Sequence, residues 1–331
     1  MRFYCENCDK VYDVSGHDYM CECGGMFRLK KDGADEFKPT VSIGEGVTPM
    51  LDFRTNNQDY LLKMESLQPT GSCKDRGAYY MINELKNRGI KKIALDSSGN
   101  AGASVAAYAT AAGMECTVYV PDDTSKEKLD QMEAYGAKFV KVPNGRMRAC
   151  AAAKMNLGDA YYASHVYNPL FMEGMKTLAY EIYEQLGKDV PEYVFTPVGN
   201  GTILIGLYEG FKEIGRLPHI VGVQSRKCAP VYERFYGLPA AQKKTTVASA
   251  IRIEDPRRIE WVVEALKESE GDVVMVDDTD ILKAAKYLGG RGIYVETTAA
   301  AGMAGALEFF KNGKPDNYRV VIAITAHGLK R

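Results

Sequence analysis

The feature that most constrains the fold is a regular alternation of strand-like and helix-like segments along most of the 331 residues. Short strand-like runs such as 92–96 and 193–197 alternate with helical segments such as 101–112 and 202–214. This alternation predicts an α/β fold with mainly parallel sheets and helices on both faces. The chain is too long for one ordinary core, so we expect two domains, or one large α/β unit with an appendage.

The individual elements follow from the same patterns. Strands are predicted at 60–64, 92–96, 116–120, 138–142, 193–197, 219–224, 272–276 and 319–325. Helices are predicted at 75–88, 101–112, 126–135, 146–157, 173–185, 202–214, 279–288 and 299–310.

The charge balance argues against two classes of partner. The 42 basic and 43 acidic residues leave a net charge of −1, which favours neither nucleic acid nor an anionic membrane as the main partner. Apolar runs such as 320–326 are too short to span a bilayer. The start, Met-Arg-Phe-Tyr-Cys, carries no long apolar stretch, so a cytoplasmic location is expected.

Four of the eight cysteines lie within the first 23 residues, at Cys5, Cys8, Cys21 and Cys23. Clustering of this kind in a cytosolic protein favours metal ligation over a disulfide framework. Four thiolates suit a closed structural zinc site, so we predict a zinc ribbon. Two alternatives are unliganded cysteines and a site in which His17 replaces one ligand. A nucleic-acid-binding ribbon is disfavoured, because residues 1–38 contain six basic and eight acidic side chains.

The first candidate catalytic residue is Lys74, in the strand-to-helix segment Pro-Thr-Gly-Ser-Cys-Lys-Asp-Arg-Gly at 69–77. Ser72 and Asp75 have the spacing of a capping box, which predicts Lys74 in the first helical turn. The positive end of the helix dipole there favours a neutral amine, the form that condenses with an aldehyde. By position alone, Lys74 is more typical of a solvated surface lysine.

Three further turns follow predicted strands. The segment 96–102, Asp-Ser-Ser-Gly-Asn-Ala-Gly, offers Ser97, Ser98 and a helix start that suit a carboxylate. The segment 198–202, Val-Gly-Asn-Gly-Thr, could cradle a phosphate in the same way, although it is not a nucleotide fingerprint. The turn at 96–102 alone is equally typical of tight β/α packing, and the segment 198–202 alone is a weak signal. Thr325 ends the last predicted strand, at the end where parallel sheets bind ligands.

Together and in this order, these segments resemble the fold-type II pyridoxal 5'-phosphate (PLP) enzymes, and specifically the threonine synthase family. Residues 69–77 are similar to that family's P-T-G-S-F-K-D-R-G, with Cys73 in place of an aromatic residue. Residues 44–49 resemble its G-E-G-x-T-P, 168–177 its N-P-x-x-x-E-G-x-K-T, and 325–330 its T-G-H-G-L-K, with Ala326 in place of Gly. The resemblance covers nearly the whole chain, including the cysteine-bearing start.

The resemblance implies a role for each candidate residue. Lys74 forms a Schiff base with PLP and moves protons once the substrate has freed it. Asn100 hydrogen-bonds the phenolic oxygen of PLP, and Ser97, Ser98 and Asn100 bind the substrate. Thr325 faces the pyridine nitrogen, and its neutral hydroxyl suits elimination and replacement more than transamination. The cofactor phosphate is held by Gly199, Asn200, Gly201 and Thr202.

The implied fold is α/β of the fold-type II, tryptophan synthase β-like kind, with two parallel-sheet domains and a small zinc-ribbon-like appendage. The domains expected are an appendage with linker at 1–38, a large PLP-binding domain at 39–80 and 186–331, and a small substrate-binding domain at 81–185. A homodimer is the family expectation. The implied function is a lyase acting on a small-molecule amino acid, with conversion of phosphohomoserine to threonine and phosphate as the best named reaction.

The sequence departs from the family where the substrate phosphate is bound. Ala101 follows the Ser-Ser-Gly-Asn turn where the family has a Thr, and Phe171 stands where many members have an Arg. A phosphate dianion without a cation is expensive to bury, although His165 could compensate. We therefore hypothesise that the leaving group differs from phosphate. The alternatives are a serine or threonine dehydratase, an ammonia-lyase or a β-replacing enzyme, and, in another class, a non-catalytic protein that kept the fold.

Overall fold

The structure is a computed structural model, and it describes residues 1–32, 36–55, 58–143 and 145–330. Part of the linker expected before residue 38, residues 33–35, lies outside the described residues. The chain forms two compact units. Unit 1 comprises residues 1–45 and 74–174, and unit 2 comprises residues 46–73 and 175–331.

Unit 1 begins its second segment at residue 74 and ends it at residue 174, whereas the sequence analysis placed these boundaries at 80 and 185. The packing of two helices explains the difference. Helix α1 (Lys74–Asn87) packs against α2 (Asn100–Ala111), which places it in unit 1. Helix α6 (Thr177–Gln185) packs against α7 (Thr202–Ile214), which places it in unit 2.

Unit 1 is built on a four-stranded parallel sheet. The strand order is β8 (Lys138–Val142), β7 (Glu115–Pro121), β6 (Lys92–Leu95) and β9 (Tyr161–Tyr162). Its remaining helices are α3 (Lys126–Ala134), α4 (Arg146–Met155) and α5 (Pro169–Met175). Because all four strands run in one direction, their carboxyl ends share one edge of the sheet.

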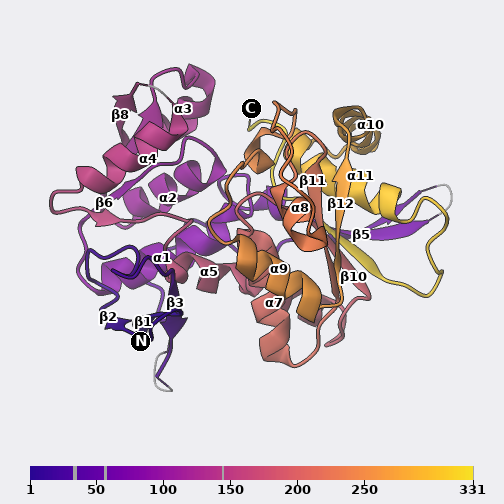
Figure 1. Cartoon of the computed structure of the whole chain (residues 1–331), viewed down its shortest axis with the longest axis horizontal. Coiled ribbons are helices and arrows are strands. Elements are labelled where there is room, and N and C mark those ends of the chain that lie inside the picture. Colours follow the sequence, from indigo (N-terminus) through magenta and orange to yellow (C-terminus); the bar gives the residue numbers. More distant parts are fainter. Residues whose placement is uncertain (33–35, 56–57, 144, 331) are drawn as a thin grey trace. The chain divides into compact units, whose positions relative to one another are not determined.

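The N-terminal appendage belongs to unit 1 and has its own small antiparallel sheet (Figure 1). The strand order is β2 (Val11–Tyr12), β1 (Arg2–Cys5) and β3 (Phe27–Lys30). Tyr19, Met20 and Met26 pack against the buried cluster that contains Ala94 and Tyr162. The appendage is therefore anchored to the hydrophobic core of unit 1.

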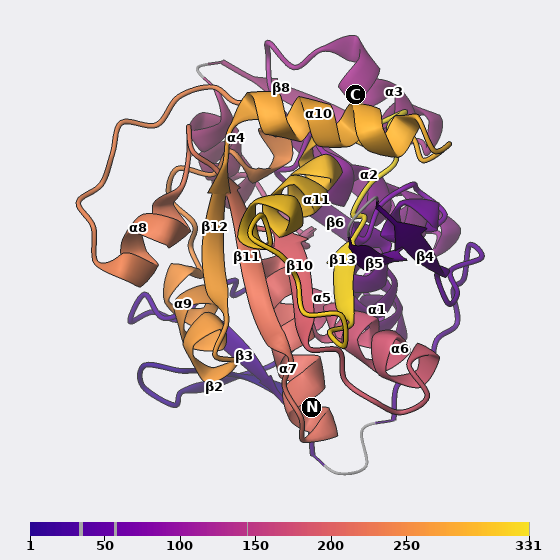
Figure 2. The same ribbon diagram turned by 90° about the vertical axis from the view of Figure 1, so that its right-hand side faces the viewer.

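Unit 2 is built on a six-stranded sheet, whose strands lie side by side across Figure 2. The strand order is β12 (Asp272–Val276), β11 (His219–Ser225), β10 (Tyr193–Pro197), β13 (Val320–Ala323), β5 (Asp59–Lys63) and β4 (Met50–Arg54). All neighbouring pairs are parallel except β4 with β5, so β4 is an antiparallel edge strand.

Helices cover both faces of this sheet, as the alternation predicts. A Cβ on Gly222 of β11 would lie 3.3 Å from Leu204 of α7, whereas the next residue, Val223, contacts Gly305 of α11 (Thr297–Phe309). Successive strand residues point to opposite faces, so α7 and α11 lie on opposite sides of the sheet. Helices α8 (Pro230–Tyr236), α9 (Ile259–Glu268) and α10 (Asp278–Gly289) complete unit 2.

The predicted strands and helices are confirmed with end shifts of a few residues. The expected helix at 173–185 is wrong as one element, because α5 ends at Met175 and α6 starts at Thr177. No prediction covered the strands β1, β2, β3, β4 and β9 or the helices α8 and α9. The single-turn helices at Glu65–Leu67 and Ser249–Ile251 were also missed, as short segments of this kind carry little periodic signal.

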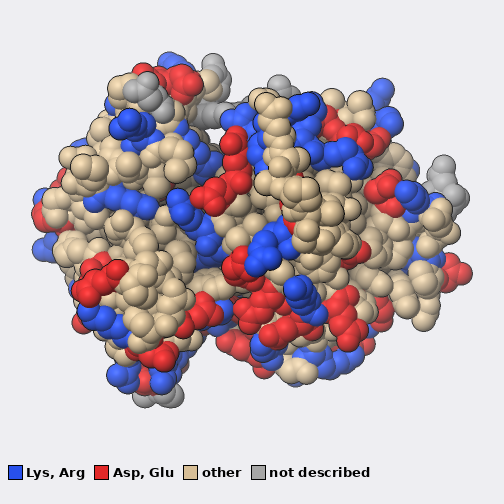
Figure 3. Space-filling model, viewed as in Figure 1, with Lys and Arg blue, Asp and Glu red and all other residues tan. Residues whose placement is uncertain are grey.

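No helix among the described residues is long and apolar enough to cross a membrane. On the face shown in Figure 3, basic and acidic side chains are both present over the two units.

A buried ion pair stabilises unit 2. The Lys63 ammonium is fully buried, lies 2.7 Å from the Glu181 carboxylate and donates hydrogen bonds to the Thr48 carbonyl and the Gln185 side chain. Thr48 also donates to the buried Glu65 carboxylate. This network joins β5 to α6 and to the segment before β4.

We expect Glu181→Ala to lower the free energy of unfolding by about 3–5 kcal/mol, because it leaves the buried ammonium without its carboxylate. Denaturant unfolding measures the loss. The control is Glu260→Ala, because the Glu260–Arg234 pair is more than half exposed and should contribute about 1 kcal/mol or less. Equal losses in the two variants would contradict the role of burial.

Candidate active site

The first part of the site is the turn that joins β6 to α2 in unit 1. Ser97 is buried, Ser98 is half-buried, and the Gly99 N–H lies 3.4 Å from the Ser97 hydroxyl oxygen. A Cβ on Gly102 would lie only 1.9 Å from the Ser97 carbonyl oxygen. Glycine at 102 therefore lets the turn fold back against the start of α2.

The start of α2 is suited to binding an anion. Asn100 is its first residue, and the first N–H groups of any helix have no acceptor within the helix. These groups and the helix dipole attract negative charge, and Ser97 and Ser98 bring hydroxyl donors to the same turn. The predicted residues Ser97, Ser98 and Asn100 thus come together in a turn that can hold a carboxylate.

The position of Lys74 is fixed by the residues before it. The Cys73 N–H donates to the Thr325 carbonyl over 2.9 Å, and Ser72 pairs with Ala326 as an isolated bridge. Lys74 is the next residue and begins α1, as predicted. The predicted capping role of Ser72 is wrong, because its hydroxyl is fully buried and has no hydrogen-bond partner in the described part of the chain.

The second part of the site is the loop that joins β10 to α7 in unit 2. Gly201 has φ +82°, and a Cβ there would lie 2.2 Å from Val262. A Cβ on Gly199 would lie 3.0 Å from Ile253 and 3.1 Å from the Ala250 carbonyl oxygen. Thr202 then begins α7. The loop leaves no room for larger residues at these two positions and ends at a helix N-terminus, where a phosphate binds well.

Thr325 lies at the same edge of the sheet in unit 2. It is buried and follows β13, which pairs in parallel with β10. Because the carboxyl ends of parallel strands share one edge, Thr325 and residues 199–202 belong to the same end of this sheet.

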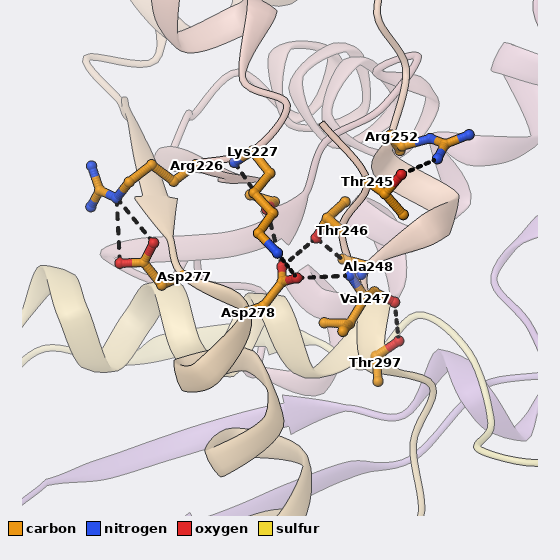
Figure 4. A network of polar contacts seen from close by, with 11 residues as sticks. Arg226, Lys227, Thr245, Thr246, Val247, Ala248, Arg252, Asp277, Asp278 and Thr297 are labelled. Carbon is orange, nitrogen blue, oxygen red and sulfur yellow. Dashed lines mark hydrogen bonds and ion pairs between the residues drawn. The ribbon is translucent and has the colours of Figure 1, made fainter. Parts of the chain in front are cut away.

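A polar network holds the segment behind the glycine loop at 199–201, and Figure 4 shows it. The Asp278 carboxylate accepts hydrogen bonds from the Thr246 hydroxyl at 2.5 Å, the Val247 N–H at 3.2 Å and the Lys227 ammonium at 2.9 Å. The Thr297 hydroxyl donates to the Val247 carbonyl. These contacts fasten the residues that lead into Ala250, whose carbonyl lies behind Gly199.

The charge of Asp278 is stabilised in this network. Burial acts to raise the pKa of the carboxyl group, but the hydrogen bonds from Lys227, Thr246 and Val247 outweigh it. The pKa therefore lies below the ordinary value of 3.8.

The four N-terminal cysteines converge in the appendage. The sulfur atoms of Cys5, Cys8, Cys21 and Cys23 all lie within 4.8 Å of one another, with 3.4 Å between Cys5 and Cys23 and 3.5 Å between Cys8 and Cys21. Tetrahedral zinc with Zn–S bonds of about 2.3 Å needs sulfur atoms about 3.8 Å apart, so the spacing fits this ion. Among the described residues, His17 is not part of the group.

The backbone around the cysteines suits metal binding. Asp9 and Gly24 have φ values of +57° and +84°, which turn the chain after each cysteine pair. A Cβ on Gly25 would lie 2.5 Å from the Cys5 sulfur, so only glycine fits there. The Tyr12 hydroxyl lies 3.1 Å from the Cys21 sulfur, and this hydrogen bond lowers the pKa of the Cys21 thiol to about 6.

The two positions that depart from the family pattern where the substrate phosphate is bound, Ala101 and Phe171, are buried in unit 1. Phe171 has no exposed surface, and its ring packs directly against Gly77 of α1. Ala101 is 4% exposed. The His165 ring is also buried and lies 5.9 Å from the Phe171 ring.

The comparisons with known proteins agree with this geometry. The family model described as pyridoxal-phosphate dependent enzyme matches residues 41–326. The chain is 32% identical to the threonine synthase of Methanocaldococcus jannaschii, over 98% of this chain and 92% of that protein. It is 35% identical to the threonine synthase of Mycobacterium leprae, over 92% and 87%.

The chain belongs to the threonine synthase family of PLP-dependent enzymes. Among solved structures, the processed form of threonine deaminase isoform 2 from Solanum lycopersicum superposes with a TM-score of 0.71 at 25% identity, over 82% of this chain and 75% of that one. The fold-type II class and the PLP-dependent lyase activity expected from the sequence are thereby confirmed.

The residues of this chain fit PLP. The lysine needed to hold an aldehyde begins α1, and the glycine loop at 199–201 forms a close-packed cradle at a helix N-terminus. The buried Ser72 hydroxyl, which has no partner among the described residues, lies two residues before Lys74. Such a group is expected to find a partner in a bound ligand.

Sequence reasoning found the turns but missed the residues behind them. Asp278 was missed, although two adjacent acidic residues at the start of a helix after a predicted strand are a recognisable signal. The need for glycine at position 102 could not be predicted from the sequence, because it depends on how closely α2 packs against the turn that precedes it.

We expect Asp278→Asn to lower the free energy of unfolding by about 1–3 kcal/mol at pH 7 and to weaken retention of PLP, because it removes a charged acceptor from the network. A lowered pKa stabilises the folded state above the unfolded value of 3.8 and loses this effect as pH falls through the folded pKa. The difference between wild type and variant should therefore shrink in acid.

Thermal unfolding and equilibrium dialysis against PLP measure both effects. The matched control is Asp280→Asn, an exposed residue in the same helical turn. A constant stability difference from pH 7 down to pH 3 would refute the role assigned to the Asp278 charge.

Proposed function

We propose that this enzyme binds PLP through Lys74 and catalyses elimination or replacement on an amino acid, as a threonine-synthase-like lyase. The observation that carries the proposal is the hydrogen bond from Cys73 to Thr325. It holds Cys73, the residue before Lys74 in the chain, against Thr325 at the carboxyl end of the sheet that also carries the glycine loop 199–201.

Each group in the site has a proposed task. PLP, when bound, supplies an electron sink that stabilises negative charge on substrate carbons. Residues 199–202 hold the phosphate, Asn100 and Thr325 orient the ring, and the turn with Ser97 and Ser98 holds the substrate carboxylate. The Lys74 amine holds the cofactor and, once displaced by substrate, carries protons between substrate carbons.

The named reaction that we propose is the conversion of phosphohomoserine and water to threonine and phosphate, in preference to the other leaving group that Ala101 and Phe171 suggested. Support comes from relatives called threonine synthases that match this chain over nearly its whole length. We further propose that the enzyme is a cytoplasmic homodimer.

A second candidate is an ammonia-lyase acting on a hydroxy amino acid. The burial of Phe171 against Gly77 and of Ala101 in α2 favours it, because both positions present apolar side chains within unit 1. A neutral hydroxyl leaving group needs no cation of the kind that a phosphate dianion requires. The structural likeness to a threonine deaminase is consistent with this candidate.

We propose that Cys5, Cys8, Cys21 and Cys23 bind a structural zinc ion. The support is the convergence of four sulfur atoms at distances that suit a tetrahedral site.

We expect the purified protein to show the visible absorbance of lysine-bound PLP. Lys74→Ala should lose this absorbance, because it removes the amine that we propose holds the cofactor. Borohydride reduction followed by mass analysis of peptides identifies the modified lysine. A wild-type protein that stays colourless with added PLP would contradict the proposal and favour a non-catalytic role.

The substrate is decided by comparing phosphate release from phosphohomoserine with oxo-acid release from L-threonine and L-serine. The proposed reaction predicts that phosphate release is at least about tenfold faster. The reverse order would replace it with the ammonia-lyase.

We expect about one zinc ion per chain by metal analysis. Cys5→Ser should release it and lower the free energy of unfolding, because metal binding contributes to folding. The control is Cys116→Ser, a buried cysteine of β7 that lies apart from the cluster. Protein purified without chelator that holds no zinc would exclude the site.

A further inference from the structure

We propose that Tyr19 and Tyr162 are positioning residues that couple the cysteine cluster to the turn at 97–100. This inference rests on the proposed function, in which that turn binds the substrate carboxylate. All the contacts involved lie within unit 1.

The coupling begins at Asp96, the residue between the end of β6 and Ser97. The Tyr162 hydroxyl donates a hydrogen bond of 2.6 Å to the Asp96 Oδ1 atom. Tyr162 lies on β9, which pairs with β6 so that Tyr162 stands opposite Ala94. Tyr162 thereby fixes the Asp96 side chain, which directly precedes the turn, through the hydrogen bond to its carboxylate.

Tyr162 is a reliable donor over the physiological pH range. Its side chain is 3% exposed, and burial together with the nearby Asp96 charge raises the pKa of its hydroxyl. The group therefore stays protonated and donates to the carboxylate. A hydrogen bond to a charged acceptor of this kind is stronger than one between neutral groups.

The ring of Tyr162 is held in turn by the appendage. Tyr19 contacts Tyr162 edge-on with 5.4 Å between ring centres, and contacts Tyr167 at 5.3 Å. The Lys154 ammonium lies 4.7 Å from the Tyr19 ring centre and 4.0 Å from that of Tyr167, and it donates to the Tyr167 hydroxyl. These contacts hold the Tyr162 ring between the appendage and α4.

Tyr19 lies in the segment between Cys8 and Cys21, two residues before the second of these cysteines. A metal that binds both cysteines closes this segment into a loop and limits the positions that Tyr19 can take. Loss of the metal loosens the loop and with it the packing of Tyr19 on Tyr162. Because binding sites are sensitive to small displacements, the turn at 97–100 then holds a carboxylate less well.

The decisive variant is Tyr162→Phe, which keeps the ring but removes the hydrogen bond to Asp96. The readout is the dissociation constant of L-threonine, from the absorbance change of bound PLP. We expect this constant to rise about tenfold. The affinity for PLP itself should stay within about twofold, since the proposed phosphate loop belongs to unit 2.

The matched control is Tyr161→Phe. Tyr161 is the neighbouring strand residue, is equally buried at 3% exposure, and also uses its hydroxyl, which accepts a hydrogen bond from the Asn168 side chain. A general loss of stability would affect both variants, whereas the proposed coupling affects L-threonine binding only in Tyr162→Phe. Equal dissociation constants in the two variants would overturn the proposal.

A second experiment tests the contribution of the metal. It compares Tyr19→Ala with removal of zinc by a chelator from the PLP-loaded enzyme. Each alone should weaken L-threonine binding about threefold to tenfold, and the two together should weaken it no more than one alone, because they act through the same contact. Unchanged binding after verified zinc removal, or fully additive losses, would overturn the coupling.

Failure of this inference can be told apart from failure of the proposed function. If Ser97→Ala weakens L-threonine binding but Tyr162→Phe does not, the turn is a binding site and the coupling is wrong. If the wild-type protein binds PLP but Ser97→Ala and Ser98→Ala both bind L-threonine normally, the proposed role of the turn is wrong, and the inference fails with it.

Discussion

The parallel direction of the strands is the constraint on which the rest of the structure depends. In unit 1 it brings the turn after β6 to the carboxyl edge of one sheet, and in unit 2 it brings the glycine loop and Thr325 to the carboxyl edge of the other. Each of these turns except the one at Thr325 leads straight into a helix, whose first N–H groups need an acceptor. Parallel β/α construction thus produces turns suited to binding an anion in both units.

Close approach is the second requirement, and glycine satisfies it. Gly102 lets the Ser97 carbonyl lie against α2. Gly199 and Gly201 let the loop after β10 lie against the segment that ends near Ile253 and against Val262. Behind these glycines stand polar side chains that fix the backbone, Asp278 in unit 2 and Asp96 in unit 1. The carboxylates of Asp96 and Asp278 both accept short or charge-assisted hydrogen bonds. These hydrogen bonds fix the acidic side chain that lies next to each turn.

The appendage adds a support that the catalytic fold alone does not contain. Its small sheet has only a few buried side chains, such as Phe3 and Phe27, and domains of this size commonly need a metal or disulfides. The four converging sulfur atoms meet that need in the proposed zinc site. The segment between them delivers Tyr19 to the core of unit 1, so the stability of the appendage and the shape of the neighbouring turn are physically connected.

The sequence by itself determined the α/β fold, the turns and the family, because periodicity, glycine spacing and motif order are local signals. Lys74, the serine turn and the four cysteines were all predicted from such patterns. Only the tertiary structure decided that Ser72 is buried rather than a helix cap, that α1 belongs to unit 1, and that Asp278 and Tyr162 stand behind the turns. These facts depend on contacts between residues far apart in the chain, and no local pattern encodes such distances.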